Sequence, residues 1–158
     1  MWLALLMFAC KTTAPLPPQT VDDEPPVVEP ADSVLANVAS VAVTGDSGSY
    51  IFAVGIRSDE TGCDRYADWW EVVSEDGDLL FRRVLSHSHV GEQPFVRSGG
   101  PVDIADTENV WVRAHLSSDG YGGTAWYGSI AGGFVATEQD ADWDDLADEA
   151  PQPGRCAF

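Results

Sequence analysis

From residue 34 onward, the chain is dominated by short segments in which apolar and polar side chains alternate. The pattern is clearest in residues 50–56, where the apolar side chains are Tyr50, Phe52, Val54 and Ile56. Alternation with a period of two places one face of a strand in the core and the other toward solvent. Turn residues separate the segments. The predicted strands are 36–44, 50–56, 65–73, 79–85, 95–97, 102–104, 109–116, 125–130 and 133–136.

About seven to nine short strands without a long helix predict an all-β, antiparallel sandwich. In residues 65–73 the pattern places Trp70 on one face and Trp69 on the other, and Asp76–Gly77 predicts a type I′ hairpin after this strand. In residues 109–116 the predicted inward side chains are Val110, Val112, Ala114 and Leu116, and the outward ones are Trp111, Arg113 and His115.

The last part of the chain changes to a helical pattern. Thr137–Asp140 is similar to a capping box. Apolar residues then recur at helical spacing, at Trp143, Leu146, Ala147 and Ala150. We therefore expect a short acidic C-terminal helix that ends at Pro151 and Pro153.

Two resemblances bear on the fold. The stretch VWVRAHLSSDGYGG (110–123) resembles the penultimate strand and following turn of fibronectin type III and other immunoglobulin-like domains. A tryptophan on an early central strand, Trp69 or Trp70, agrees with it. The resemblance implies an immunoglobulin-like β-sandwich. Residues 63–128 also resemble uncharacterised bacterial secreted proteins that share a His-Ser-His-Val pattern, which implies no function.

The N-terminal segment WLALLMFA (2–9) is apolar and ends at Cys10. It is too short to span a bilayer, which takes about 20 residues. Ala9–Cys10 resembles the signal junction of bacterial lipoproteins. This implies cleavage before Cys10, lipid attachment to its sulfur and anchoring in the bacterial envelope, with Lys11 favouring the outer membrane. A plain signal peptide or a buried N-terminus is the alternative.

Composition completes the organisation of the chain. Residues 11–33 contain six prolines and an acidic group at 22–24, which predicts an extended, solvated tether. We therefore divide the chain into a signal segment (1–10), a tether (11–33) and a β-sandwich domain with its C-terminal helix and tail (34–158). The net charge of −18 excludes nonspecific nucleic-acid binding. It indicates solubility, as in a saline habitat, or attraction of cations or a basic partner.

Three cysteines are present. With Cys10 lipidated, Cys63 and Cys156 form an even pair, which in an exported domain predicts a disulfide. Two free thiols, as in a cytosolic protein, are the alternative.

The stretch from Leu79 to Gly100 is the candidate chemical site. His87, His89 and His115 with Glu92 could hold zinc or another transition metal. Residues 87–92 partly resemble the first cupin motif, but the spacing from His89 to Glu92 is too short and the second motif is absent. The alternative is a hydrogen-bonded polar network without a cofactor, which fixes the loop through His87, His89, Glu92, Gln93 and Arg97.

Three other kinds of functional site have weaker support in the sequence: a calcium site, a catalytic nucleophile and an aromatic binding surface. Asp140, Asp142 and Asp144 have alternate spacing, but the EF-hand pattern fails after them, so we expect a solvated acidic face. No nucleophile motif is present. Trp69, Trp111 and Trp126 are expected to face outward, where they would form a binding surface for sugars or peptides unless the tail helix or a second sheet covers them.

The sequence as a whole predicts an envelope lipoprotein that contacts the membrane through its lipid. Its β-sandwich would serve as a binding or structural module for a protein or carbohydrate partner that the sequence does not identify. The alternative is a metal-binding protein or metal-dependent enzyme that uses the three histidines.

Overall fold

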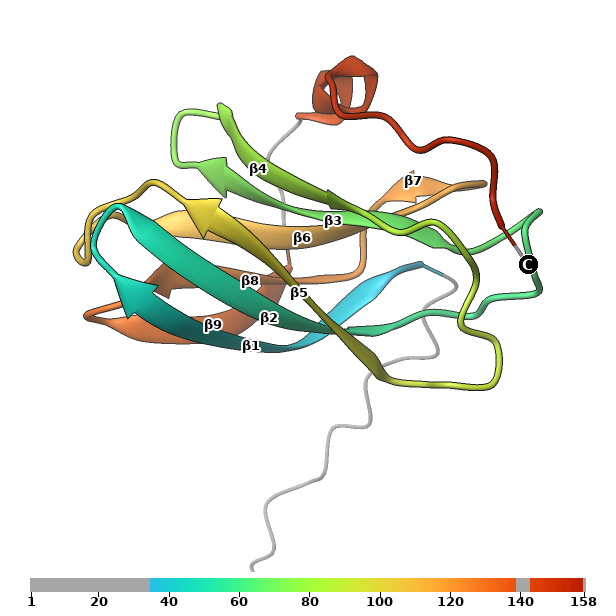
Figure 1. The fold of residues 1–158 in the computed structure, drawn as a ribbon, viewed down its shortest axis with the longest axis horizontal. Helices are drawn as coiled ribbons and strands as arrows, with labels where there is room; N and C mark the ends of the chain where they lie inside the picture. The colour runs from blue at the N-terminus through green and yellow to red at the C-terminus, as the bar shows by residue number, and fades with distance from the viewer. Residues whose placement is uncertain (1–34, 139–142, 158) are drawn as a thin grey trace, which may run out of the picture.

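The structure, a computed structural model, describes residues 35–138 and 143–157. Its strands form two antiparallel sheets, so the predicted antiparallel β-sandwich is confirmed (Figure 1). The elements are β1 (Asn37–Asp46), β2 (Ser49–Arg57), β3 (Ala67–Ser74), β4 (Leu79–Val84), β5 (Phe95–Val102), β6 (Val110–Leu116), β7 (Gly120–Tyr121), β8 (Thr124–Ser129), β9 (Gly133–Glu138) and the 3₁₀ helix η1 (Asp144–Asp148).

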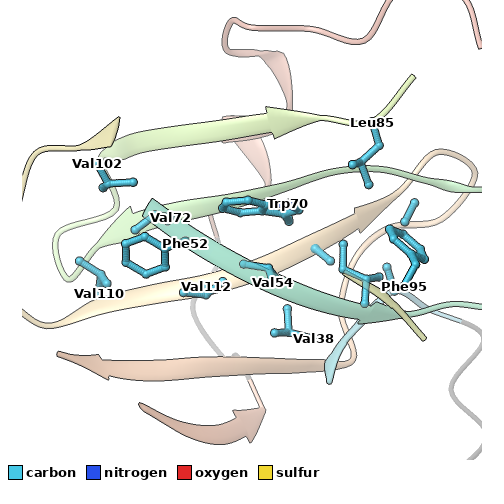
Figure 2. Packing of buried hydrophobic residues seen from close by; sticks show 14 of the residues in the cluster. Val38, Phe52, Val54, Trp70, Val72, Leu85, Phe95, Val102, Val110 and Val112 are labelled. Carbon is cyan, nitrogen blue, oxygen red and sulfur yellow. The ribbon is translucent and has the colours of Figure 1, made fainter. Parts of the chain in front are cut away.

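The first sheet has the order β1-β2-β5, and the second has the order β4-β3-β6-β8-β9 with β7 paired to β6. The core lies between them. Figure 2 shows Phe52 and Val54 from one sheet and Trp70 from the other in this core, and all three side chains are fully buried. The alternation predicted for β2 and β6 is confirmed, because every predicted inward residue of both strands is buried.

Strand β5 differs from the prediction of two short pieces. It runs unbroken through Gly99, Gly100 and Pro101. Because β5 is the last strand of its sheet, one of its edges needs no ladder partner, and an edge strand tolerates proline and glycine. Gly99 also packs closely: a Cβ there would lie 2.8 Å from Phe81 and 3.0 Å from Trp70.

The hairpin between β3 and β4 is confirmed, but its turn is not of type I′. Gly77 has a positive φ of 89°, whereas no non-glycine residue in the described ranges does, so Asp76 lacks the conformation that a type I′ turn needs. The backbone N–H of Ser74 instead donates to the carbonyl of Asp78 across a longer loop (2.9 Å).

The predicted short C-terminal helix is present only as the 3₁₀ helix η1, and its predicted start at Thr137 is wrong. Thr137 belongs to strand β9, where it pairs with Ala125, and the only helical turn in the described tail is η1. Leu146 is buried as expected. Asp148 and Glu149 at the C-terminal end of η1 oppose a longer helix through the helix dipole, and no basic residue lies in its last turn. In the described ranges no helix is long and apolar enough to cross a membrane.

Candidate functional site

The outer face of the second sheet holds a buried cluster of charged side chains. Glu71 on β3 is fully buried and lies between Arg82 of β4 and Arg113 of β6. Arg82 Nε donates to Glu71 Oε2 (2.8 Å), and Arg113 Nε donates to Oε1 (2.7 Å). The register sets this arrangement, because Glu71 lies opposite both arginines. Buried charges are tolerated when they are paired and hydrogen-bonded, and both arginines pair with Glu71, although Arg113 Nη1 has no hydrogen-bond partner among the described residues.

The chain's own C-terminus covers this cluster. We call residues 143–157 the C-terminal strap; it lies over β3 and β4 in Figure 1. Arg82 donates to the carbonyls of Leu146 (2.6 Å) and Glu149 (2.6 Å), and Arg113 donates to the carbonyl of Trp143 (3.0 Å). The two guanidinium groups therefore use one side for Glu71 and the other for the strap. Their chemistry is structural, since they bind the chain's own backbone.

A disulfide fixes the far end of the strap. Cys63 and Cys156 are bonded with a Cα–Cα distance of 5.6 Å, which confirms the predicted pair. The backbone N–H of Ala157 also donates to the carbonyl of Ser86 (2.6 Å). The strap is thus held at both ends, by the arginines near Trp143 and by the disulfide near the last residues.

Next to the charged cluster, Trp69 is buried rather than exposed. Its ring stacks on His115 at 3.7 Å and lies under Arg82, whose guanidinium is 4.5 Å from the ring centre. His115 Nδ1 is 2.7 Å from Asp68 Oδ1. Burial raises the pKa of the neighbouring Tyr121 to about 12, and Glu71 adds to the effect. Trp69 and His115 therefore contribute to packing beneath the strap.

Trp126 lies on the opposite side from the other two tryptophans. It pairs with Val112, which faces the core, and its indole N–H donates to the carbonyl of Val38 in the first sheet (2.9 Å). Of the three tryptophans expected to face outward, Trp69 and Trp111 lie on the outer face, but Trp69 is buried beneath Arg82 and the strap, and Trp126 faces the first sheet. The three therefore form no common exposed surface, and the alternative, in which the tail and the other sheet cover such side chains, applies to two of them.

The remaining tryptophan, Trp111, belongs to a partly exposed row across the outer face. Backbone register places Trp111 beside Tyr127 and Tyr127 beside Val135. The rings of Trp111 and Tyr127 are 4.8 Å apart, and Val135 is 64% exposed. We call Trp111, Tyr127 and Val135 the outer aromatic row. Glu75 flanks it and accepts a hydrogen bond from the Tyr127 hydroxyl.

The loop between β4 and β5 contains the other histidines. His89 is buried and stacks on Phe95 at 3.7 Å, and neither of its ring nitrogens has a hydrogen-bond partner. Burial lowers the pKa of His89, and the nearby Arg97 guanidinium lowers it further. The ring of His87 is 4.6 Å from that of His89. Burial and the nearby Arg97 charge therefore both favour a neutral His89 in the folded protein.

Part of the predicted polar network is present in this loop, without the imidazoles. Arg97 pairs with Glu92 (2.9 Å), and Gln93 donates to the carbonyl of His89 (3.2 Å). The sequence prediction missed Glu60, a buried carboxylate that accepts hydrogen bonds from the backbone N–H groups of His89 and Ala67. Its position in a polar loop gave no signal of burial.

The predicted metal centre is not formed. His115 lies on β6, paired with Asp68 and stacked on Trp69, rather than in the loop of His87 and His89. Within 35–138 and 143–157, no three His, Cys, Asp or Glu side chains are grouped to hold a metal ion. Cys10, Asp140 and Asp142 lie outside the described residues, as do the signal segment and the tether.

One shallow groove opens at the side of the sandwich between β4 and β5, with a volume of about 420 Å³. Phe81, Arg83 and Val84 line one wall, and Ser98, Gly99 and Gly100 line the other. It contains no grouping of acid, base and nucleophile. Arg82, which sequence reasoning did not single out, and Pro151 of the strap also line the groove. Glu71, the other charged residue that was missed, is buried beneath the strap.

Comparison with known proteins gives one informative relative. The chain is 42% identical over 91 residues to a protein of Halomicrobium mukohataei named "Putative lipoprotein". The match covers 57% of this chain and 45% of the relative, so the chain spans less than half of the relative's length. No family model matches the chain. No solved structure matches it either.

Proposed function

We propose that this protein is a lipid-anchored protein of the cell envelope, and that its β-sandwich serves as a binding or structural module. The observation that carries the proposal is the similarity to a relative named as a lipoprotein, together with the Ala9–Cys10 junction. The Cys63–Cys156 disulfide supports an oxidising compartment outside the cytosol.

The strand order supports an immunoglobulin-like type of sandwich. Strands β1-β2-β5 face β4-β3-β6-β8, which is the division expected when the chain passes between two sheets by Greek-key connections. Trp70 on the early central strand β3 is fully buried, as the buried tryptophan of immunoglobulin domains is.

The proposed location is the envelope, without assignment to an outer membrane. The relative is from a halophilic archaeon, so the similarity gives no support to the bacterial outer membrane that Lys11 favoured. The net charge of −18 agrees with a saline habitat, in which acidic side chains keep a protein hydrated and soluble.

The described contacts favour a binding or structural role over metal-dependent catalysis. Glu71, Arg82 and Arg113 hold the C-terminal strap, and His115 pairs with Asp68 beneath it. Each of these groups is engaged in holding the fold. A binding role requires exposed contact groups, which the outer aromatic row provides.

The anchor is tested by expressing the full-length chain and a Cys10→Ser variant in a haloarchaeal host. We expect the unmodified chain in the membrane fraction and the variant in the soluble fraction, with a lipid mass on Cys10 of the former. Cys63→Ser/Cys156→Ser is the matched control, since it also replaces cysteine by serine yet should stay with the membrane. A Cys10→Ser chain that stays membrane-bound would overturn the proposal.

A further inference from the structure

The covered part of the second sheet shows how this face holds cations. The Arg82 guanidinium lies 4.5 Å above the Trp69 ring, and that of Arg113 lies 3.6 Å above the Tyr121 ring. Both arginines also pair with the carboxylate of Glu71. An aromatic ring attracts a cation through its quadrupole, and a nearby carboxylate adds a charge partner. On this face, each of the two buried arginines is therefore held by an aromatic ring together with the Glu71 carboxylate.

Two residues farther along β3 and β6, the same face carries a second set of aromatic side chains with a carboxylate beside them. Val73 lies opposite Trp111, which in turn lies opposite Tyr127. Glu75 directly follows β3 and contacts the Tyr127 hydroxyl. Trp143 of the strap packs edge-on against Trp111 at 6.3 Å. The cation–ring contacts in the described ranges are at Trp69, Phe95 and Tyr121, so no described arginine lies over this row.

The row is also accessible. Val135 is the most exposed of the large apolar side chains that the structure describes, at 64%, and Trp111 and Tyr127 are half-buried. Arginine and lysine have long apolar stems that pack along such side chains while the charged head extends beyond them. A stem on Val135 and Tyr127 would bring the head to the Trp111 ring and to Glu75.

The negative charge of the protein determines which class of ligand the outer aromatic row can bind. The chain has 26 acidic and 8 basic residues, and four of those basic residues (Arg65, Arg82, Arg97 and Arg113) already have carboxylate partners. Exposed acidic residues at 75 and 76 flank the row on the side of the β3–β4 turn. Salt screens the long-range field of these carboxylates, but at contact distance they favour cationic groups and disfavour anionic ones.

We propose that the outer aromatic row, together with Glu75, binds an arginine-bearing segment of a basic partner polypeptide. Arginine fits better than lysine, because its planar guanidinium both stacks on an indole and donates two parallel hydrogen bonds to a carboxylate. This inference deepens the proposed binding role by naming a partner class. It does not depend on the lipid anchor, so each can fail without the other.

The test uses the full-length chain in a non-ionic detergent and a short fluorescein-labelled Gly-Ser peptide that carries arginines at alternate positions. Binding is measured by fluorescence anisotropy. We expect Glu75→Gln and Trp111→Ala each to weaken binding by roughly tenfold. The control Asp46→Asn removes one exposed charge from the first sheet and should leave the affinity unchanged.

A second peptide, with citrulline in place of arginine, keeps the shape of the side chain and removes its charge. We expect it not to bind. Equal weakening by Asp46→Asn and Glu75→Gln would show only diffuse attraction to an acidic protein and would overturn the proposal, as would equal binding of the citrulline peptide. Because Trp111→Ala removes packing against Trp143, Val135→Ser gives a second variant at an exposed position, with the same expected direction.

Discussion

Replacing Glu71 by glutamine tests whether the charged cluster holds the C-terminal strap in place. The substitution keeps the size of the side chain and removes its charge. The side chains of Arg82 and Glu71 are 0% exposed and that of Arg113 is 3% exposed. The variant therefore leaves two buried guanidinium groups without a carboxylate, at a place where water does not replace it.

The expected loss of stability follows from this burial. Removing one partner of a buried ion pair costs about 3–5 kcal/mol. The glutamine carbonyl still accepts one hydrogen bond, so we take the lower end, about 3 kcal/mol. With a urea m-value of about 2 kcal/mol per molar for a domain of this size, the unfolding midpoint should fall by about 1.5 M.

Urea unfolding followed by tryptophan fluorescence measures this shift. Glu92→Gln is the matched control, since Glu92 also pairs with an arginine, Arg97, but at the surface. We expect a much smaller change for the control, because solvent screens exposed pairs. If the Glu71 variant shifts the midpoint no more than the Glu92 variant, the buried cluster does not stabilise the domain as argued.

Three further outcomes are expected. Replacing both Cys63 and Cys156 by alanine should lower the free energy of unfolding by about 4–5 kcal/mol in calorimetry, because the disulfide closes a loop with a sequence separation of 93; an unchanged value would contradict this. Since the pKa of His89 is lowered in the folded state, the unfolded chain binds the proton more readily, and stability should fall as pH drops below about 6.5; His89→Leu should flatten this dependence in unfolding curves between pH 7 and 5. Gly128→Ala should destabilise the β8–β9 hairpin, because φ is 153° and a Cβ would lie 2.0 Å from the Gly133 carbonyl oxygen; an unchanged melting temperature would refute this.

The strands could be predicted from the sequence because burial of one face of a strand makes apolar and polar side chains alternate along consecutive residues. The alternation at Tyr50–Ile56 and at Val110–Leu116 predicted strands and their inward faces correctly. The Cys63–Cys156 pair followed from cysteine arithmetic. These inferences need only the spacing of apolar side chains along the chain or the chemistry of one residue type.

Helix and edge-strand predictions failed where long-range contacts outweighed local preference. Trp143 and Leu146 have helical spacing, but the carbonyls of the tail are held by Arg82 and Arg113 from distant strands, and only one 3₁₀ turn forms. The Gly-Gly-Pro run at 99–101 reads as a break, yet it continues β5 because that strand lies at a sheet edge.

The sequence by itself determined the fold class, the disulfide pair and the acidic character of the chain, since each depends on composition or local period. Only the tertiary structure decided which polar groups meet. It separated His115 from His89, buried Glu71 between two arginines from neighbouring strands, and left Trp111 and Tyr127 accessible beside Glu75. The physical reason is that strand register and the path of the strap are set by packing between residues far apart in the chain.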